Sequence, residues 1–468
     1  MKSELQPAVA DGDAMFFSLK PAPPKPELPE DRIDSTYRLL REQVFLGTFI
    51  GYAGYYLVRK NISLANSSLM TEYGYTEAQL GFAASAIALS YGLSKFVMGN
   101  VSDRSNARKF LTLGLVLTAS INIFLGFFHA AFSSIALIYG ILFLNGWVQG
   151  MGWAPCGRSM VHWFSRSERG TRMAVWNVAH NVGAGLVAPL TILAAVFFGP
   201  ESWRMNIFFF PALCTFGIAA VTYLLMRDTP QSCGLPSIEH YKNEFPENYS
   251  ESHEKELTPR EIFFSYVFNN KFLWAIAFAN AFVYLVRYGV IDWVPLYLER
   301  VKEFSKTDAK WAFFACEYAG IPGTLLCGWM SDKLFRGKRG PATILFMLLV
   351  MAAIAVYWLC PPGYYWITVG ALIAFGFLIY GPVMLIGLHA LELVPKKAAG
   401  TAAGLTGLLG YFVGTQLAGF GIGFLVTYSG WDAAYYSLIC ACLLACLFAA
   451  WTVLPGTKRK ESETSVSG

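Results

Sequence analysis

Tyr-Leu-Val-Arg at residues 56–59 recurs 228 residues later as Tyr-Leu-Val-Arg at residues 284–287. Each copy lies inside an apolar stretch that is long enough to cross a membrane. A second motif keeps the same register: Gly-Asn-Val-Ser-Asp-Arg places Asp103 44 residues after Arg59, and Gly-Trp-Met-Ser-Asp-Lys places Asp332 45 residues after Arg287. Two unrelated motifs that repeat in register predict a chain built from two copies of one unit.

The composition indicates an integral membrane protein. Of the 468 residues, 55% are hydrophobic and only 14% are charged, against about 25% charged residues in a soluble protein. Spanning helices need about 20 apolar residues each. The sequence predicts twelve of them: 43–64, 78–100, 109–129, 133–156, 173–198, 205–226, 272–295, 308–330, 341–359, 364–388, 400–427 and 433–454.

Lysine and arginine are concentrated in the loops after the even-numbered helices, which by the positive-inside rule predicts that both termini are cytoplasmic. The longest polar interruption separates two halves of six helices each. The predicted organisation is a cytoplasmic N-terminal tail 1–41, an N-terminal half 42–226, a cytoplasmic linker 227–271, a C-terminal half 272–454 and a cytoplasmic tail 455–468. An even number of helices in each half makes the repeats parallel. This arrangement resembles the major facilitator architecture, in which substrate binds near the midplane between the halves.

The two repeated arginines, Arg59 and Arg287, are the first candidates for a site. An arginine at mid-bilayer is costly, by roughly 2.5–3.5 kcal/mol on translocon scales, and is a functional hypothesis by default. Its planar guanidinium matches the oxygens of a phosphate and stays charged in any environment. Two arginines related by the repeat predict one anion held between the halves. The alternative is a structural ion pair. Its candidate partner Asp292 lies five residues after Arg287, off the i+3/i+4 face.

Other polar residues within apolar helices extend the predicted site. Lys95 and His180 are candidates for the anion, His180 because it can gain a proton as a phosphate dianion arrives. Asn177 lies beside it, whereas His389, near a helix end, is interpreted as structural. Lys60, Asp292 and Glu317 are a candidate ion-pair cluster that closes one face of the cavity. The Ser-Asp motifs are interpreted as structural or gating elements at helix ends. Tyrosines add hydroxyl donors: Tyr52, Tyr56, Tyr91, Tyr284, Tyr380 and Tyr411.

Charge predicts how such a site is coupled to movement. Two like charges about 10 Å apart repel by roughly 1.7 kcal/mol at an effective dielectric near 20. A dianion cancels this repulsion, so the loaded carrier is expected to reorient readily and the empty one poorly. The hypothesis is therefore exchange of one anion for another, with inorganic phosphate as counter-substrate.

Longer stretches resemble the organophosphate:phosphate antiporter family of the major facilitator superfamily, over about residues 20–454. They are 54–61, 91–96, 227–236, 320–332 and 380–392. The resemblance implies that Arg59 and Arg287 bind phosphate and that Lys95 and His180 contribute. It also implies that the six tyrosines line the path and that Lys60, Asp292 and Glu317 form an outward-side gate. Ala184, where a family glycine is expected, is one departure.

The resemblance implies uptake of sn-glycerol 3-phosphate in exchange for inorganic phosphate by a functional monomer in the bacterial inner membrane. The alternatives are an antiporter whose substrate is hexose 6-phosphate or phosphoglycerate, and a sugar-phosphate sensor of the same fold. No nucleophile–base pair or metal-type cysteine spacing is visible, so we expect neither an enzyme nor a cofactor. The expected partners are the two phosphates and the lipid bilayer, with no nucleic acid.

Overall fold

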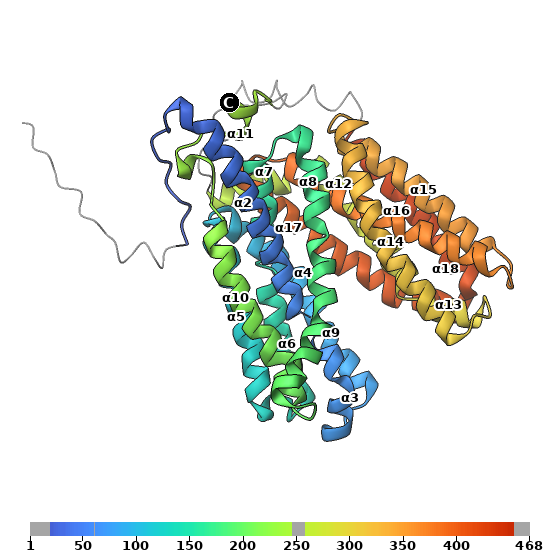
Figure 1. The fold of residues 1–468 in the computed structure, drawn as a ribbon. Coiled ribbons are helices and arrows are strands. Elements are labelled where there is room, and N and C mark those ends of the chain that lie inside the picture. The colour runs from blue at the N-terminus through green and yellow to red at the C-terminus, as the bar shows by residue number, and fades with distance from the viewer. Residues whose placement is uncertain (1–18, 60, 246–257, 454–468) are drawn as a thin grey trace, which may run out of the picture.

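The computed structural model describes residues 19–59, 61–245 and 258–453, which are helical apart from turns and loops (Figure 1). The N-terminal half contains these elements: α2 (Glu30–Leu57), α3 (Ile62–Tyr73), α4 (Glu77–Asp103), α5 (Ala107–Phe127), η1 (His129–Phe132), α6 (Ile135–Gln149), α7 (Trp153–Trp163), α8 (Arg166–Asn177), α9 (Ala179–Phe198), η2 (Met205–Phe209) and α10 (Phe210–Leu225).

The linker region contains η3 (Gln231–Cys233), α11 (Ile238–Lys242) and the π-helical η5 (Glu261–Phe268). The C-terminal half contains these elements: α12 (Lys271–Ile291), α13 (Val294–Arg300), α14 (Lys306–Lys333), α15 (Arg339–Leu359), α16 (Tyr365–Glu392), η6 (Lys396–Ala398), α17 (Ala399–Leu409), η7 (Gly410–Gly414), η8 (Leu417–Gly421) and α18 (Ile422–Trp451).

These helices account for the twelve predicted spans. Nine segments of the described residues are long and apolar enough to cross a membrane. The last of them, 396–451, turns sharply at Gly430 (φ 81°, ψ 176°) and supplies two spans. The 28-residue helices α2 and α14, which carry more charge, supply the other two. The predicted all-α fold of twelve transmembrane helices is confirmed.

The first helix starts earlier than predicted. α2 begins at Glu30, twelve residues before the predicted boundary at residue 42, so part of the expected tail is helical. Pro29 precedes it, and Glu30 and Asp31 occupy its first turn, where acidic side chains favour the positive end of the helix dipole. The sequence hides this extension because residues 30–41 are polar and resemble a tail rather than a span.

The two halves meet at one end and diverge towards the other, where α3 and α13 lie (Figure 1). Extensive contacts between the halves join α4, α7 and α8 with α14, α16, α17 and η7. The end at which the halves meet carries the cationic loops after α4, α7, α14 and α16, and we call it the cation-rich end.

Polar contacts fix the chain before α2 and the start of the linker to the cation-rich end. The buried carboxylate of Asp228 accepts hydrogen bonds from the backbone N–H groups of Ala22 and Ala107, both at 2.9 Å. Further along the linker, Tyr241 stacks on Tyr37 with ring centroids 4.0 Å apart. Its hydroxyl donates to Asp34, which lowers the pKa of that carboxyl.

Candidate functional site

Arg59 lies where the first transmembrane segment breaks. α2 ends at Leu57, Val58 leaves the helical region (φ −125°, ψ 17°), and α3 resumes at Ile62. Arg59 is 7% exposed, and its guanidinium lies over two tyrosine rings, 3.9 Å from the centroid of Tyr91 and 4.9 Å from that of Tyr56. Desolvated cation–π contacts of this kind contribute about 2 kcal/mol each. The sequence predicted an unbroken span over 43–64, and the break corrects that prediction.

Amide side chains from neighbouring helices stabilise the break. The carbonyl of Val58 accepts from Asn122 Nδ2 at 3.2 Å and from Asn145 Nδ2 at 3.1 Å, and Gln149 Nε2 donates to the carbonyl of Tyr55 at 3.1 Å. A backbone carbonyl without a partner is costly inside a membrane. These three amides therefore make a non-helical Arg59 possible, and the sequence analysis did not identify them.

Arg287 occupies the equivalent place in the other half, but it lies within continuous helix, in α12. Its guanidinium is 4.4 Å from the ring centroid of Tyr380 and 4.9 Å from that of Tyr288. The hydroxyl of Tyr380 donates to Glu317 Oε2 at 2.6 Å. Tyr288 was not predicted, because it is adjacent to Arg287 rather than one helical turn away.

Neither arginine forms a direct ion pair with a carboxylate of the described residues. None lies within 4 Å of Arg59 or Arg287, although nine other ion pairs are present. Among the described residues, the buried donor Arg287 Nε has no hydrogen-bond partner. Aromatic faces stabilise a cation but accept few of its N–H groups, so the five donors of each guanidinium suit an anionic ligand.

Lys95 and Tyr411 bring the halves together beside Arg59. Lys95 is 6% exposed, and its Nζ lies 4.7 Å from the ring centroid of Trp153 and 6.0 Å from that of Tyr411. Tyr411 comes from the other half, in the π-helical η7, and contacts Tyr91 edge-on at 5.0 Å and Tyr284 at 5.2 Å. Trp153 was not predicted as a site residue.

His180 lies just after Val178, the turn residue between α8 and α9, whose backbone stays in the right-handed helical region (φ −63°, ψ −20°). Its ring centroid is 5.6 Å from that of Tyr56 in its own half and 6.5 Å from that of Tyr380 in the other. Asn177, half-buried, ends α8 three residues before His180. Tyr52 completes the aromatic wall, with its ring 5.5 Å from that of Tyr56.

The structure thus places Arg59, Lys95, His180, Arg287 and the six predicted tyrosines around one locus between the halves. The predicted gate of Lys60, Asp292 and Glu317 remains a prediction. Lys60 lies outside the described residues, Asp292 is exposed just after α12, and Glu317 accepts from Tyr380.

The family model of the Major Facilitator Superfamily matches residues 44–418. The chain belongs to this superfamily. It is 53% identical over 447 residues to the glycerol-3-phosphate transporter of Bacillus subtilis (strain 168), covering 96% of this chain and 100% of the relative. It is 49% identical over 471 residues to the glycerol-3-phosphate transporter of Haemophilus influenzae, covering 95% and 98%. A probable hexose phosphate transport protein of Chlamydia muridarum is 39% identical over 442 residues, covering 92% and 95%.

The superfamily fold is also evident in solved structures. The transporter FucP, solved in the outward conformation, matches with a TM-score of 0.66 at 13% identity, covering 87% of this chain and 98% of that one. The predicted family resemblance is therefore confirmed, and the protein is an integral membrane transporter of the Major Facilitator Superfamily.

In this superfamily member the two repeated aspartates close the cation-rich end in the same way. Asp103, at the end of α4, accepts from the backbone N–H groups of Gly400 at 2.6 Å and Thr401 at 2.7 Å, and from the Thr401 hydroxyl at 2.6 Å. All three bonds cross from one half to the other, to the start of α17.

Asp332, at the end of α14, makes the equivalent contacts with Gly170 and Thr171, in the first half of α8. It accepts from Gly170 N at 3.1 Å, from Thr171 N at 2.6 Å and from the Thr171 hydroxyl at 2.8 Å. The same carboxylate pairs with Arg339 in its own half at 2.5 Å. We call Asp103, Asp332 and the two Gly-Thr pairs the aspartate latch. It gives the Ser-Asp motifs a definite place at the seam between the halves.

Close backbone approach accompanies each aspartate of the latch. A Cβ on Gly328 would lie 2.7 Å from the carbonyl oxygen of Gly170, and a Cβ on Gly99 would lie 2.9 Å from the carbonyl carbon of Gly400. Only glycine fits where two helices touch this closely.

Charged side chains add asymmetric contacts to the seam. Glu392 of the C-terminal half pairs with Arg339 at 3.0 Å and with Arg169 of the N-terminal half at 3.1 Å. In the linker, Glu239 pairs with Lys396 at 2.5 Å. Buried charges of this kind are strongly destabilising if one partner is removed.

Proposed function

We propose that the protein takes up sn-glycerol 3-phosphate in exchange for inorganic phosphate, with the phosphate group held between Arg59 and Arg287. One observation carries the proposal: each half contributes one arginine that rests on tyrosine faces and has no carboxylate partner among the described residues. The names of the relatives support glycerol 3-phosphate as the organic substrate.

The proposed setting is the bacterial inner membrane, with the cation-rich end in the cytoplasm as the positive-inside rule indicates. In that orientation the halves are closed towards the cytoplasm and diverge towards the outside, so the conformation faces outward (Figure 1). The Tyr91–Tyr411 and His180–Tyr380 contacts between the halves are ring contacts among the proposed site residues. Because the latch joins the halves at the closed, cation-rich end, a ligand that enters from outside would meet the two arginines before it meets the latch.

The exchange follows from the charges at this site. Arg59 and Lys95 are buried, at 7% and 6% exposure, and they share with Arg287 a space that must close when the carrier reorients. Desolvating charges that are not neutralised is costly. A dianion lowers that cost in either direction of movement. An empty carrier lacks this compensation, which couples entry of one phosphate species to exit of another. Each twelve-helix chain carries both arginines, so a monomer is sufficient for this mechanism.

Counterflow tests substrate and coupling together. Purified protein is reconstituted in proteoliposomes loaded with inorganic phosphate, and labelled glycerol 3-phosphate, glucose 6-phosphate and 3-phosphoglycerate are presented separately outside. We expect uptake of glycerol 3-phosphate that disappears when internal phosphate is omitted. Uptake that is equally fast into empty vesicles would refute the exchange mechanism.

The alternatives give different results in the same assay. Preference for glucose 6-phosphate or phosphoglycerate would keep the arginine site but change the organic substrate. Binding of phosphate esters without uptake of any of them would indicate a sensor.

A further inference from the structure

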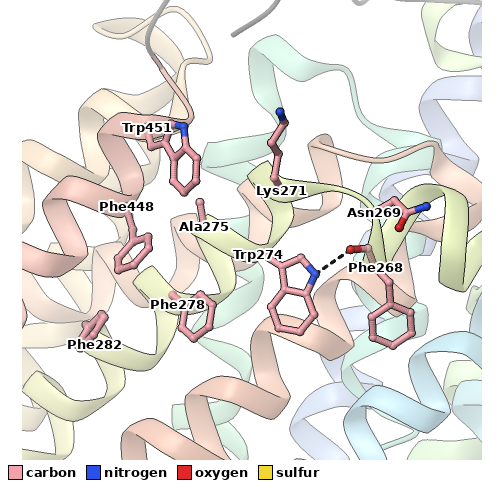
Figure 2. A pocket seen from close by; sticks show the side chains of 9 residues that line it. All are labelled: Phe268, Asn269, Lys271, Trp274, Ala275, Phe278, Phe282, Phe448 and Trp451. Atoms are coloured by element: carbon pink, nitrogen blue, oxygen red, sulfur yellow. Dashed lines mark hydrogen bonds between the residues drawn. The ribbon is translucent and has the colours of Figure 1, made fainter. Parts of the chain in front are cut away.

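A pocket opens on the C-terminal half, lined by the end of η5, the first turns of α12 and the end of α18 (Figure 2). Its cavity volume is about 530 Å³. Lys271, which begins α12, and Trp451, which ends α18, both line it. None of its lining residues belongs to the proposed phosphate site, so the pocket needs an explanation of its own.

The pocket is polar at one end and aromatic along the other. Lys271 and Asn269 are exposed and lie at the polar end, and Figure 2 shows the Lys271 side chain extending away from the aromatic rings. Phe278, Phe282 and Phe448 form the aromatic part, with ring centroids 5.7 Å (Phe278–Phe448) and 5.9 Å (Phe282–Phe448) apart. A ligand that fits both ends carries a negative group joined to an apolar chain.

The position of the pocket indicates where that ligand comes from. Tryptophans concentrate at membrane–water boundaries, and Trp274 and Trp451 both line this pocket. Phe278 is 40% exposed and Trp451 is 43% exposed, so they present apolar surface to the surroundings of the helices. Since α12 begins and α18 ends at the cation-rich end, the pocket lies at the level of the cytoplasmic leaflet in the proposed orientation.

We propose that this pocket binds one anionic phospholipid of the cytoplasmic leaflet. The lipid phosphate lies against Lys271 and Asn269, and an acyl chain covers Phe278, Phe282 and Phe448. The charges are complementary, because the cytoplasmic leaflet is anionic and attracts lysine near its surface. The N-terminus of the 21-residue α12 adds the positive end of its dipole to the charge of Lys271.

The bound lipid would also support the closed seam. Phe268 lines the pocket, and its carbonyl accepts from Trp274 Nε1 at 3.0 Å, the dashed line in Figure 2. The same Phe268 ring contacts Phe96 on α4 of the other half, with centroids 6.1 Å apart. Lipid that fills the pocket therefore braces η5 against α4 in this conformation.

Native mass spectrometry of the full chain in detergent measures this directly. Phosphatidylglycerol and phosphatidylcholine of equal chain length are titrated separately, and the fraction of protein that retains one lipid is recorded. We expect tighter retention of phosphatidylglycerol, and a loss of about fivefold in Lys271→Gln, the fold-change that corresponds to about 1 kcal/mol for one lysine near an anionic lipid. Lys333→Gln removes an exposed charge from the end of α14 and should leave retention unchanged.

Each other outcome overturns the proposal. Equal loss in both lysine variants would mean that retention follows net charge rather than this pocket. Equal retention of the two lipids, unchanged in Lys271→Gln, would mean that the lipid headgroup does not contact Lys271. Retention of neither lipid would exclude a phospholipid as the occupant of this pocket. Because lipid retention is measured without transport, it is independent of the substrate proposal.

Discussion

Asp103→Asn tests whether the aspartate latch sets the conformation. The Asp103 carboxylate accepts three hydrogen bonds, all from Gly400 and Thr401 across the seam, at 2.6–2.7 Å. Asparagine has the same shape but only one acceptor oxygen, and its Nδ2 would face an N–H donor. At least one charge-assisted bond is lost, which amounts to about 1.5–3 kcal/mol. In the proposed orientation these bonds must break when the cytoplasmic end opens, so the whole loss falls on the outward-facing state.

This free energy converts to a shift of about 10- to 150-fold in the ratio of inward-facing to outward-facing protein, at 1.4 kcal/mol per tenfold. Distances between spin labels report that ratio. Leu39 on α2 and Leu334 after α14 are both exposed, at 59% and 62%, and belong to opposite halves at the closed end. Cysteines at these two positions, with the native cysteines replaced, allow double electron–electron resonance in lipid nanodiscs. We expect a longer-distance population that grows in Asp103→Asn.

The matched control is Asp308→Asn. Asp308 lies at the other end of α14, and its carboxylate accepts from Ser305 of the same half at 2.6 Å. The substitution is chemically identical but breaks no bond between the halves. A distance distribution that does not change in Asp103→Asn, or that changes as much in Asp308→Asn, would refute the latch as the determinant of this state.

Three further substitutions test the site and the seam. Arg59→Lys keeps the charge but loses the planar fork, and losing one charge-assisted bond should raise the Kd for phosphate about 10- to 150-fold by titration calorimetry; an unchanged Kd would remove Arg59 from the site. Gly328→Ala places a Cβ 2.7 Å from a carbonyl oxygen across the seam and should open the closed end, whereas Gly217→Ala, in open space, should not. Equal spin-label distance distributions in the two variants would contradict close packing at Gly328. Tyr380→Phe deletes the hydroxyl that donates to Glu317, so the KM for organic phosphate should rise by about 2- to 10-fold, as expected for one hydrogen bond; an unchanged KM would mean that Tyr380 only packs.

Much of the fold follows from the sequence, because membrane spans are long and the constraints on them are simple. Apolar length gave the number of helices, and the internal repeat divided them into halves. The helix break at Val58 and the turn at Val178 could not be found in this way, since the residues around them are compatible with a helix. The first break depends on Asn122 and Asn145, which come from other helices and satisfy the freed carbonyl.

The site was predicted to the extent that charge and repetition reveal it. Arg59 and Arg287 are costly residues in equivalent places, and the structure brings them to one locus with Lys95 and His180. Trp153 and Tyr288 were missed because a cation–π contact depends on which ring face a helix presents, and spacing does not fix that.

The latch partners, in contrast, had a signal that was available. Gly170-Thr171 and Gly400-Thr401 are identical dipeptides 230 residues apart, in nearly the same register as the repeated arginines. The aspartates of the latch bind both of these dipeptides. Short repeats at a constant spacing therefore carry information on the seam as well as on the site.

In the proposed exchange mechanism, the latch and the arginines together account for the need for an anion during movement. Opening the cytoplasmic end breaks both aspartate contacts, at a cost of about 1.5–3 kcal/mol for each charge-assisted bond. A ligand promotes that step only by interacting more strongly with the state that follows. Arg59 and Arg287 belong to different halves, so an anion that bonds both of them binds best when the halves come together around it. Closure of the outer end over a dianion can then offset the loss of the latch, whereas closure over two bare guanidiniums adds repulsion to that loss.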